Sequence, residues 1–193
     1  TTYRDRYRNR SMEGFVGKGS LALPSFEGKG TIEMTQPVNF AVIGCGALAM
    51  GSHIPNLAAS SKARLHTCCD IAAAALAACR QKYPSVKTST QWEEAVRDPE
   101  VEAICLATTE KLRLPVIELA ASLGKPVYVE KPLARTLEEM KAIQRVVHAA
   151  GIPFCVGHNR RCAPILREAH RLFRGHMEKP QPCPWRWDRE GDG

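Results

Sequence analysis

A hexapeptide of small and apolar residues, GCGALA at positions 44–49, is the first feature of this sequence that could do chemistry. It fits the spacing G-x-G-x-x-[GA] and directly follows a short apolar run that is typical of a buried strand. Gly44 would permit a tight turn, Gly46 would let the backbone approach a pyrophosphate, and Ala49 would allow close packing of helix against strand. The same spacing also occurs in strand-to-helix turns that bind no ligand, so alone it leaves both interpretations open.

The helix predicted to open after Gly46 would supply hydrogen-bond donors for that phosphate. The backbone N–H groups of its first residues, Ala47 and Leu48, have no acceptor within the helix, and the helix dipole adds partial positive charge at this end. We therefore expect Gly44, Gly46, Ala47 and Leu48 to contact a dinucleotide cofactor.

Asp70 ends the second predicted strand, about 26 residues after Gly44. A carboxylate near this distance accepts hydrogen bonds from both ribose hydroxyls of an adenosine and repels a 2′-phosphate. Residues 71–78 contain no Arg or Lys that could receive such a phosphate, so the sequence favours NAD over NADP. Asp70 could instead act as the N-cap of the helix that follows it, and both roles can coexist.

The tripeptide Glu130-Lys131-Pro132 follows a short predicted strand at 127–129. Ligands of open α/β sheets bind at the carboxyl ends of the strands, and an ammonium there can stabilise charge that develops on a reacting oxygen. Lys131 is therefore a candidate catalytic residue, and the Lys131–Pro132 bond is a candidate cis peptide. Taken alone, the tripeptide is better explained as a surface Glu-Lys pair in a loop.

Alternating strands and helices predict the framework that positions these groups. The expected strands are 38–43, 64–70, 85–88, 103–107, 127–129 and 153–156. The expected helices are 47–57, 71–83, 91–97, 112–123 and 137–150. This alternation indicates βαβ units and an α/β fold with a doubly wound, mostly parallel sheet of the Rossmann type. Pro55 should disturb the first helix near Gly51, whose carbonyl its ring would meet.

Together these motifs resemble the Gfo/Idh/MocA oxidoreductases, the superfamily of glucose-fructose oxidoreductase, inositol dehydrogenase and MocA. The resemblance covers about residues 38–170. Besides the glycine loop and Asp70, it includes HIPNL at 53–57, DPEV at 98–101, EKPLA at 130–134 and GHNRR at 157–161. The block EKP at this distance from the glycine loop is quite specific to the family.

The resemblance implies an NAD(P)-dependent oxidoreductase that transfers a hydride between nicotinamide and a sugar, cyclitol or related polyol. It implies that Lys131 lies near the nicotinamide and the substrate, and that Glu130 belongs to the same cofactor-binding block. Thr108 is expected to face the cofactor, and Arg160 to contribute near its nicotinamide end. We expect NAD as the cofactor, a homo-oligomer for the full-length protein and a cytoplasmic location.

The chain departs from the family pattern after the fourth predicted strand, where Arg113 stands near the position of a usual His. We expect a flexible lead at 1–37, the dinucleotide-binding domain at 38–158 and the truncated start of the substrate domain at 159–193. The family's catalytic His and Asp would lie in the missing part, because His158, His170 and His176 match no such position. The alternative function is therefore a non-catalytic NAD-binding module or regulator.

Charge and hydropathy exclude other classes of protein. The net charge is +7, but the excess is spread over both ends and the middle of the chain, and aromatic residues make up 6%. That pattern argues against a nucleic-acid partner. The sequence contains no run of 18 apolar residues, which argues against a membrane span.

The sequence contains eight cysteines, and no two have the spacing C-x-x-C. Five of them lie in or beside strand-like apolar runs, where a free thiol behaves as a small hydrophobic side chain: Cys45, Cys68, Cys69, Cys105 and Cys155. We therefore expect reduced thiols, with no metal ligands and no disulfides.

Overall fold

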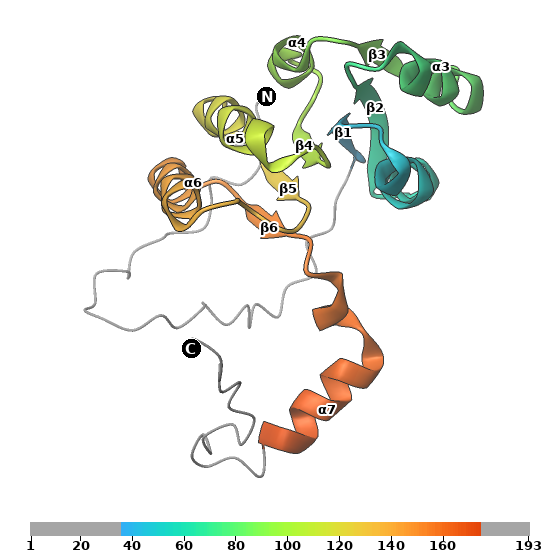
Figure 1. Cartoon of the computed structure of the whole chain (residues 1–193). Helices are drawn as coiled ribbons and strands as arrows, with labels where there is room; N and C mark the ends of the chain where they lie inside the picture. The colour runs from blue at the N-terminus through green and yellow to red at the C-terminus, as the bar shows by residue number, and fades with distance from the viewer. Residues whose placement is uncertain (1–35, 175–193) are drawn as a thin grey trace, which may run out of the picture. The chain divides into compact units, whose positions relative to one another are not determined.

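The computed structural model describes residues 36–174 (Figure 1). Most of the predicted lead and the last part of the predicted second domain, with His176 and Cys183, lie outside the described residues. The contacts divide the chain into two compact units with a boundary after Gly157.

Six parallel strands form one sheet in the order β3-β2-β1-β4-β5-β6. The strands are β1 (Val38–Ile43), β2 (Ala63–Cys69), β3 (Lys87–Ser89), β4 (Ala103–Leu106), β5 (Val127–Val129) and β6 (Phe154–Val156). This order is that of the doubly wound dinucleotide-binding fold, which confirms the predicted fold class. The largest shift from the predicted strands is in β3, because Val86 donates its backbone N–H to the Tyr83 carbonyl and belongs to a turn.

The helices lie between the strands, as the alternation predicted. They are η1 (Ala49–His53), α2 (Ile54–Ala59), α3 (Ala73–Lys82), α4 (Trp92–Arg97), α5 (Arg113–Ser122), α6 (Leu137–Ala150) and, in the second unit, α7 (Pro164–Arg174). Two short 3-10 segments are η2 (Glu110–Leu112) and η3 (Asn159–Cys162). The bounds of α6 follow from its caps, since Thr136 Oγ1 accepts from the Glu139 N–H and Gly151 ends the helix at φ 61°.

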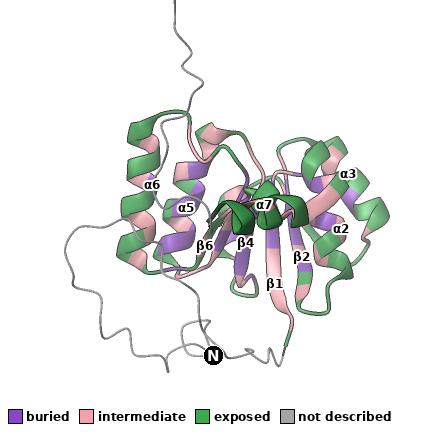
Figure 2. Cartoon of the chain, turned by 90° about the horizontal axis from the view of Figure 1, so that it is seen from below, coloured by how far each residue is buried: buried purple, intermediate pink, exposed green. Residues whose placement is uncertain are grey.

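Both faces of the sheet are covered, so alternate residues of the central strands enter different cores. Ala41, Ile43, Ile104 and Leu106 pack on the side of α4, α5 and α6. Val42, Cys68 and Cys105 pack on the opposite side with η1, α2 and α3. Figure 2 shows α5 and α6 on one side of the sheet and α2 and α3 on the other, with the buried positions concentrated on the strands between them. A fully parallel sheet requires such cover on both faces.

The disturbance predicted near Gly51 takes the form of a π-helical turn, η1. Pro55 has no N–H to donate to the Gly51 carbonyl, and its ring would clash with that carbonyl in a regular α-helix. The Ile54 N–H instead donates to the Ala49 carbonyl, five residues earlier. A wider turn of this kind is one of the known responses to such a break.

Within residues 36–174, none of the helices combines the length and the apolar character that crossing a bilayer would require.

Candidate functional site

The two glycines of the loop after β1 have different structural roles. Gly44 has a φ of 93°, and a Cβ on it would lie 2.8 Å from the carbonyl oxygen of Ala107. The loop therefore requires glycine at this position for its own backbone path. A Cβ on Gly46 would meet no atom within 4 Å, so the space beside it is open.

Asp70 connects the glycine loop to the segment that precedes α3. Its Oδ2 accepts a 2.7 Å hydrogen bond from the Cys45 N–H, and its Oδ1 accepts a 2.8 Å bond from the Ala72 N–H. The suggestion that Asp70 caps the following helix is wrong, because α3 begins at Ala73 and its N-cap is Ala72. Each carboxylate oxygen keeps a second lone pair with which it can accept a bond from a ligand.

A cavity of about 300 Å³ lies at the carboxyl ends of β1, β2 and β4. Four of the residues predicted to bind a cofactor line it: Gly44, Gly46, Asp70 and Thr108. Apolar walls come from Trp92, at the start of α4, and from Ile71, which is 90% exposed. The fold therefore brings the glycine loop and the acid of β2 to one concave surface, where a flat ring could lie against Trp92 or Ile71.

Glu130 and Lys131 follow β5, the strand beside β4, and do not line this cavity. The Glu130 side chain is buried, whereas Lys131 is exposed. Glu130 Oε2 accepts a 3.1 Å hydrogen bond from the backbone N–H of Lys131, so the buried acid holds the backbone of the exposed lysine. The Lys131–Pro132 peptide bond is cis, as the sequence suggested.

His53 and Tyr128 surround the other oxygen of Glu130. The Tyr128 hydroxyl donates a 3.1 Å hydrogen bond to Oε1, and His53 Nε2 lies 3.0 Å from the same oxygen, within ion-pair distance but not aligned as a hydrogen bond. The two rings meet edge to face with their centroids 5.4 Å apart. Burial and the bond to Glu130 raise the pKa of Tyr128 well above its usual value, so the hydroxyl stays a donor.

Gly157 closes this group from the side of β6. A Cβ there would lie 2.9 Å from Glu130 Oε1 and would collide with the Tyr128 hydroxyl. The group therefore joins three elements of the sheet region. The π-turn η1 carries His53, β5 leads into Glu130, and Gly157 after β6 leaves space for the Tyr128 hydroxyl and Glu130 Oε1.

Arg113 lies at the first position of α5 and is 3% exposed. Its Nη2 donates a 2.9 Å hydrogen bond to the Thr108 carbonyl, and Glu110 is 3.9 Å away. Among the described residues, its Nε and Nη1 have no hydrogen-bond partner, and burial lowers the pKa of the guanidinium. Arg113 thus supports the loop that carries Thr108 rather than facing solvent.

Residues 38–158 match the family model described as an oxidoreductase family with an NAD-binding Rossmann fold, GFO_IDH_MocA. The chain belongs to the Gfo/Idh/MocA family. This membership confirms the resemblance that the glycine loop, Asp70 and the EKP block indicated.

Family members of known activity are similar to parts of this chain. A D-xylose dehydrogenase of Paenarthrobacter nicotinovorans is 28% identical over 133 residues, which are 58% of this chain and 34% of that protein. The NAD(+)-dependent scyllo-inositol 2-dehydrogenase of Bacillus subtilis (strain 168) is 36% identical over 88 residues, which are 45% of this chain and 26% of that protein. The chain thus spans about a third or less of the length of these two relatives.

The same fold occurs in the crystal structure of a scyllo-inositol dehydrogenase from Lactobacillus casei with bound NAD(H) and scyllo-inositol. The two structures superpose with a TM-score of 0.68 at 24% sequence identity, over 74% of this chain and 43% of that chain.

Two residues of this Gfo/Idh/MocA chain belong to the site but were not predicted as parts of it from the sequence: His53 and Trp92. His53 lies in the motif HIPNL, but its partner Glu130 is far away in sequence, and no local pattern joins them. Trp92 could have been suspected as a wall of the cavity, because it begins α4, the helix that follows β3, and β3 is the edge strand beside β2. Arg160, predicted to bind the cofactor, lies in η3 of the second unit, and its contact with the cofactor stays a prediction.

Proposed function

We propose that this chain is the cofactor-binding part of an NAD-dependent oxidoreductase that acts on a CH–OH group of a sugar, cyclitol or related polyol. The convergence of Gly46, Asp70 and Thr108 on one cavity is the observation that carries the proposal. The open space beside Gly46 fits the close approach of a pyrophosphate to the backbone. The residues present therefore suit a nicotinamide dinucleotide, which when bound would supply the acceptor or donor of hydride.

The adenosine end of the cofactor belongs at Asp70. Its carboxylate would accept from the ribose hydroxyls and would repel a 2′-phosphate, which supports a preference for NAD. The backbone N–H groups of Ala47 and Leu48 would serve the pyrophosphate, and Thr108 would face the cofactor from the end of β4.

Lys131 is the residue to which we assign chemistry. Its exposed ammonium follows β5, and the buried carboxylate of Glu130 fixes its backbone. The ammonium would donate a hydrogen bond to the substrate oxygen and stabilise negative charge on it while the C–H bond is made or broken. Glu130 would act as a positioning residue for Lys131, together with His53 and Tyr128.

We infer that residues 159–193 form the beginning of a second domain, and that residues 1–37 form a lead before the cofactor-binding domain. The second domain would supply the base that takes the hydroxyl proton, and Arg160 at its start would reach toward the nicotinamide end of the cofactor. We expect the full-length protein to form a homo-oligomer and to work in the cytoplasm, where its free thiols would stay reduced.

A non-catalytic NAD-binding protein is the second candidate, and the position of Arg113 favours it. Where the family usually has a His, this chain has the buried guanidinium of Arg113, which donates to the Thr108 carbonyl. The residue beside the cofactor-facing loop therefore differs from the family pattern. Turnover of a sugar or cyclitol by the full-length protein would decide for the enzyme, and NAD binding without turnover would decide for the second candidate.

Calorimetric titration of NAD tests the cofactor site in this chain. Gly46→Val should abolish measurable binding without unfolding the protein, because its methyl groups fill space that no protein atom occupies. Gly51→Val is the matched control: a Cβ on Gly51 also meets no atom within 4 Å, but Gly51 does not line the cavity. Normal NAD binding by folded Gly46→Val would show that the loop is only a structural turn.

A further inference from the structure

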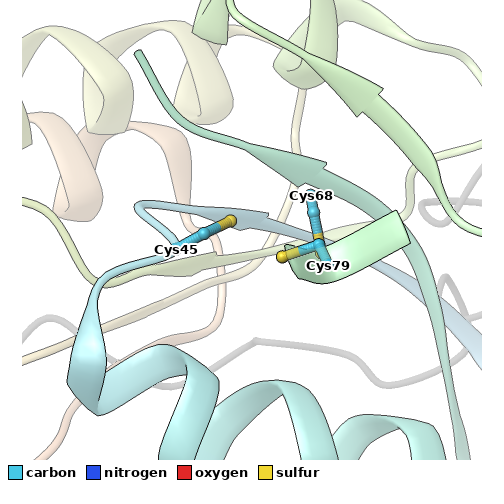
Figure 3. Close-up of side chains that lie close together, drawn as sticks. All are labelled: Cys45, Cys68 and Cys79. Carbon is cyan, nitrogen blue, oxygen red and sulfur yellow. The ribbon is translucent and has the colours of Figure 1, made fainter. Parts of the chain in front are cut away.

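Three buried thiols lie close together directly behind the glycine loop. Cys45 belongs to that loop, Cys68 to β2 and Cys79 to α3, and their Sγ atoms all lie within 4.8 Å of one another (Figure 3). All three residues are at most 2% exposed and none is in a disulfide. The thioether of Met50 lies next to them, with its Sδ 3.3 Å from Cys79 Sγ.

The fold brings these three cysteines together, although no spacing in the sequence indicates that they are close. Cys68 and Cys69 are neighbours on β2, but they point to opposite faces of the sheet, so only Cys68 reaches Cys45 and Cys79. Cys45 and Cys68 are free and buried, as expected for thiols that act as small hydrophobic side chains. Cys155 is free and lies on β6, but it is exposed, so the expected hydrophobic role is wrong for it.

The arrangement suits a metal ion in both distance and donor type. Thiolates at about 2.3 Å from an ion lie about 4 Å from one another in a trigonal arrangement, so the cluster needs only a small contraction. Its members are three thiols, with a thioether beside them, and the group of ligand atoms includes no imidazole or carboxylate among the described residues. Such a soft donor set selects thiophilic ions over hard ones such as Mg²⁺.

We propose that Cys45, Cys68 and Cys79 form a binding site for one thiophilic cation of the Cu(I) or Cd(II) type, with Met50 as a weak fourth ligand. Each thiol that ligates the ion releases its proton to solvent, and the oxidation state of the ion does not change. Zn²⁺ should bind more weakly, because its tetrahedral sites take a fourth nitrogen, oxygen or thiolate ligand and the cluster offers only a thioether.

Without an ion, the cluster should be chemically quiet. Burial raises the pKa of the Cys79 thiol to about 11, with the neighbouring Cys45 as the next cause. A hydrogen bond with Cys68 and burial raise the pKa of the Cys45 thiol well above its usual value, and the charge of Asp70 acts in the same direction. These thiols are therefore poor nucleophiles at neutral pH, and an ion has to displace their protons.

The ion would join three separate segments: the glycine loop, the end of β2 and the helix α3. Because the cluster is assembled only in the folded chain, a bound ion should stabilise the folded state and raise the melting temperature. This effect does not depend on the proposed oxidoreductase function, since it requires neither cofactor nor substrate.

The test uses the full chain with three cysteines replaced by Ser, so that they cannot bind the probe: Cys155 and Cys162, which are exposed, and Cys183, which lies outside the described residues. Titration with Cd(II) under reducing, oxygen-free conditions should give thiolate-to-cadmium charge-transfer absorbance that saturates at one equivalent, with a rise in melting temperature. Cu(I), delivered from a weak chelator, should compete with Cd(II) for the same site. Absence of a one-to-one signal in this background would overturn the proposal.

Single substitutions then locate the ion. Cys79→Ala should weaken Cd(II) binding by more than the roughly 10- to 100-fold that loss of an outer-shell partner costs. Cys105→Ala is the matched control, since Cys105 is buried in the same core but outside the cluster. If Cys79→Ala does not fold by circular dichroism, Cys68→Ser provides the same comparison. Equal affinity in the cluster variant and the control variant would contradict the assignment.

Discussion

Asp70 Oδ2 accepts a 2.7 Å hydrogen bond from the backbone N–H of Cys45, so the acid at the end of β2 is joined to the glycine loop inside the protein. The acid therefore has two tasks in the proposed site: it recognises the ribose and it holds the loop that receives the pyrophosphate. A substitution at Asp70 should affect both.

Asp70→Ala should lower NAD affinity at least tenfold, while NADP affinity holds or rises. Each hydrogen bond to a charged acceptor contributes about 1.5–3 kcal/mol, and the loss of repulsion toward a 2′-phosphate favours NADP. Calorimetric titration of both cofactors measures the change. Asp70→Asn serves as the control for the loop contact, because its amide oxygen can keep one internal bond while the charge is lost. An unchanged NAD affinity in Asp70→Ala would contradict the assignment.

Lys131→Met, made in the full-length protein, should leave NAD affinity near that of the wild type and reduce turnover about a hundredfold. A charged hydrogen bond to the reacting oxygen contributes roughly 3 kcal/mol to the transition state, and the Met side chain keeps the length of the stem. Steady-state kinetics and NAD titration give the two readouts. Lys141→Met, an exposed lysine of α6, should change neither. An active Lys131→Met enzyme would refute the catalytic role.

Gly44→Ala should destabilise the fold by about 2 kcal/mol or more, whereas Gly46→Ala should change stability by less than about 0.5 kcal/mol. A methyl group added at Gly44 would be forced against the Ala107 carbonyl at a positive φ, but one added at Gly46 would enter open space. Urea unfolding of both variants measures the difference. Equal stability of the two would show that the loop relaxes around the added carbon.

Gly157→Ala should destabilise the fold by about 1–3 kcal/mol, because its Cβ would overlap the Tyr128 hydroxyl and crowd Glu130 Oε1. Tyr128→Phe removes the hydroxyl and should recover part of that loss. The double variant should therefore be more stable than the sum of the two single changes allows. Urea unfolding of the four proteins measures this coupling, and strict additivity would show that the two groups do not interact.

Local sequence patterns predicted the elements because their causes are local. The bounds of β5 and α6 agree with the predicted ranges, since apolar alternation and the caps at Thr136 and Gly151 act within a few residues. The same holds for Gly44, whose positive φ belongs to one turn, whereas the role of Gly46 toward a pyrophosphate stays a prediction.

Contacts between distant segments were not predictable in this way. The pairing of His53 with Glu130 and the proximity of Cys45 to Cys79 arise only when the sheet assembles. The sequence placed Arg113 near a usual His of the family, but only the fold shows that it is buried at the start of α5 and donates to the Thr108 carbonyl. The sequence could also not place the start of the helix that follows Asp70, because the N-cap of α3 is Ala72 and not Asp70.

The π-turn η1 also sets the angular phase of the first helix. Ala49 and Ile54 are five residues apart and both are buried, at 1% and 0% exposure, on the same side of the sheet. In a regular α-helix, two residues at this separation would point about 140° apart. The turn therefore acts as a one-residue insertion in the helix, which lets Ala49 and Ile54 pack into the same core. A homologue with an uninterrupted helix here would need one residue fewer to keep the same two contacts.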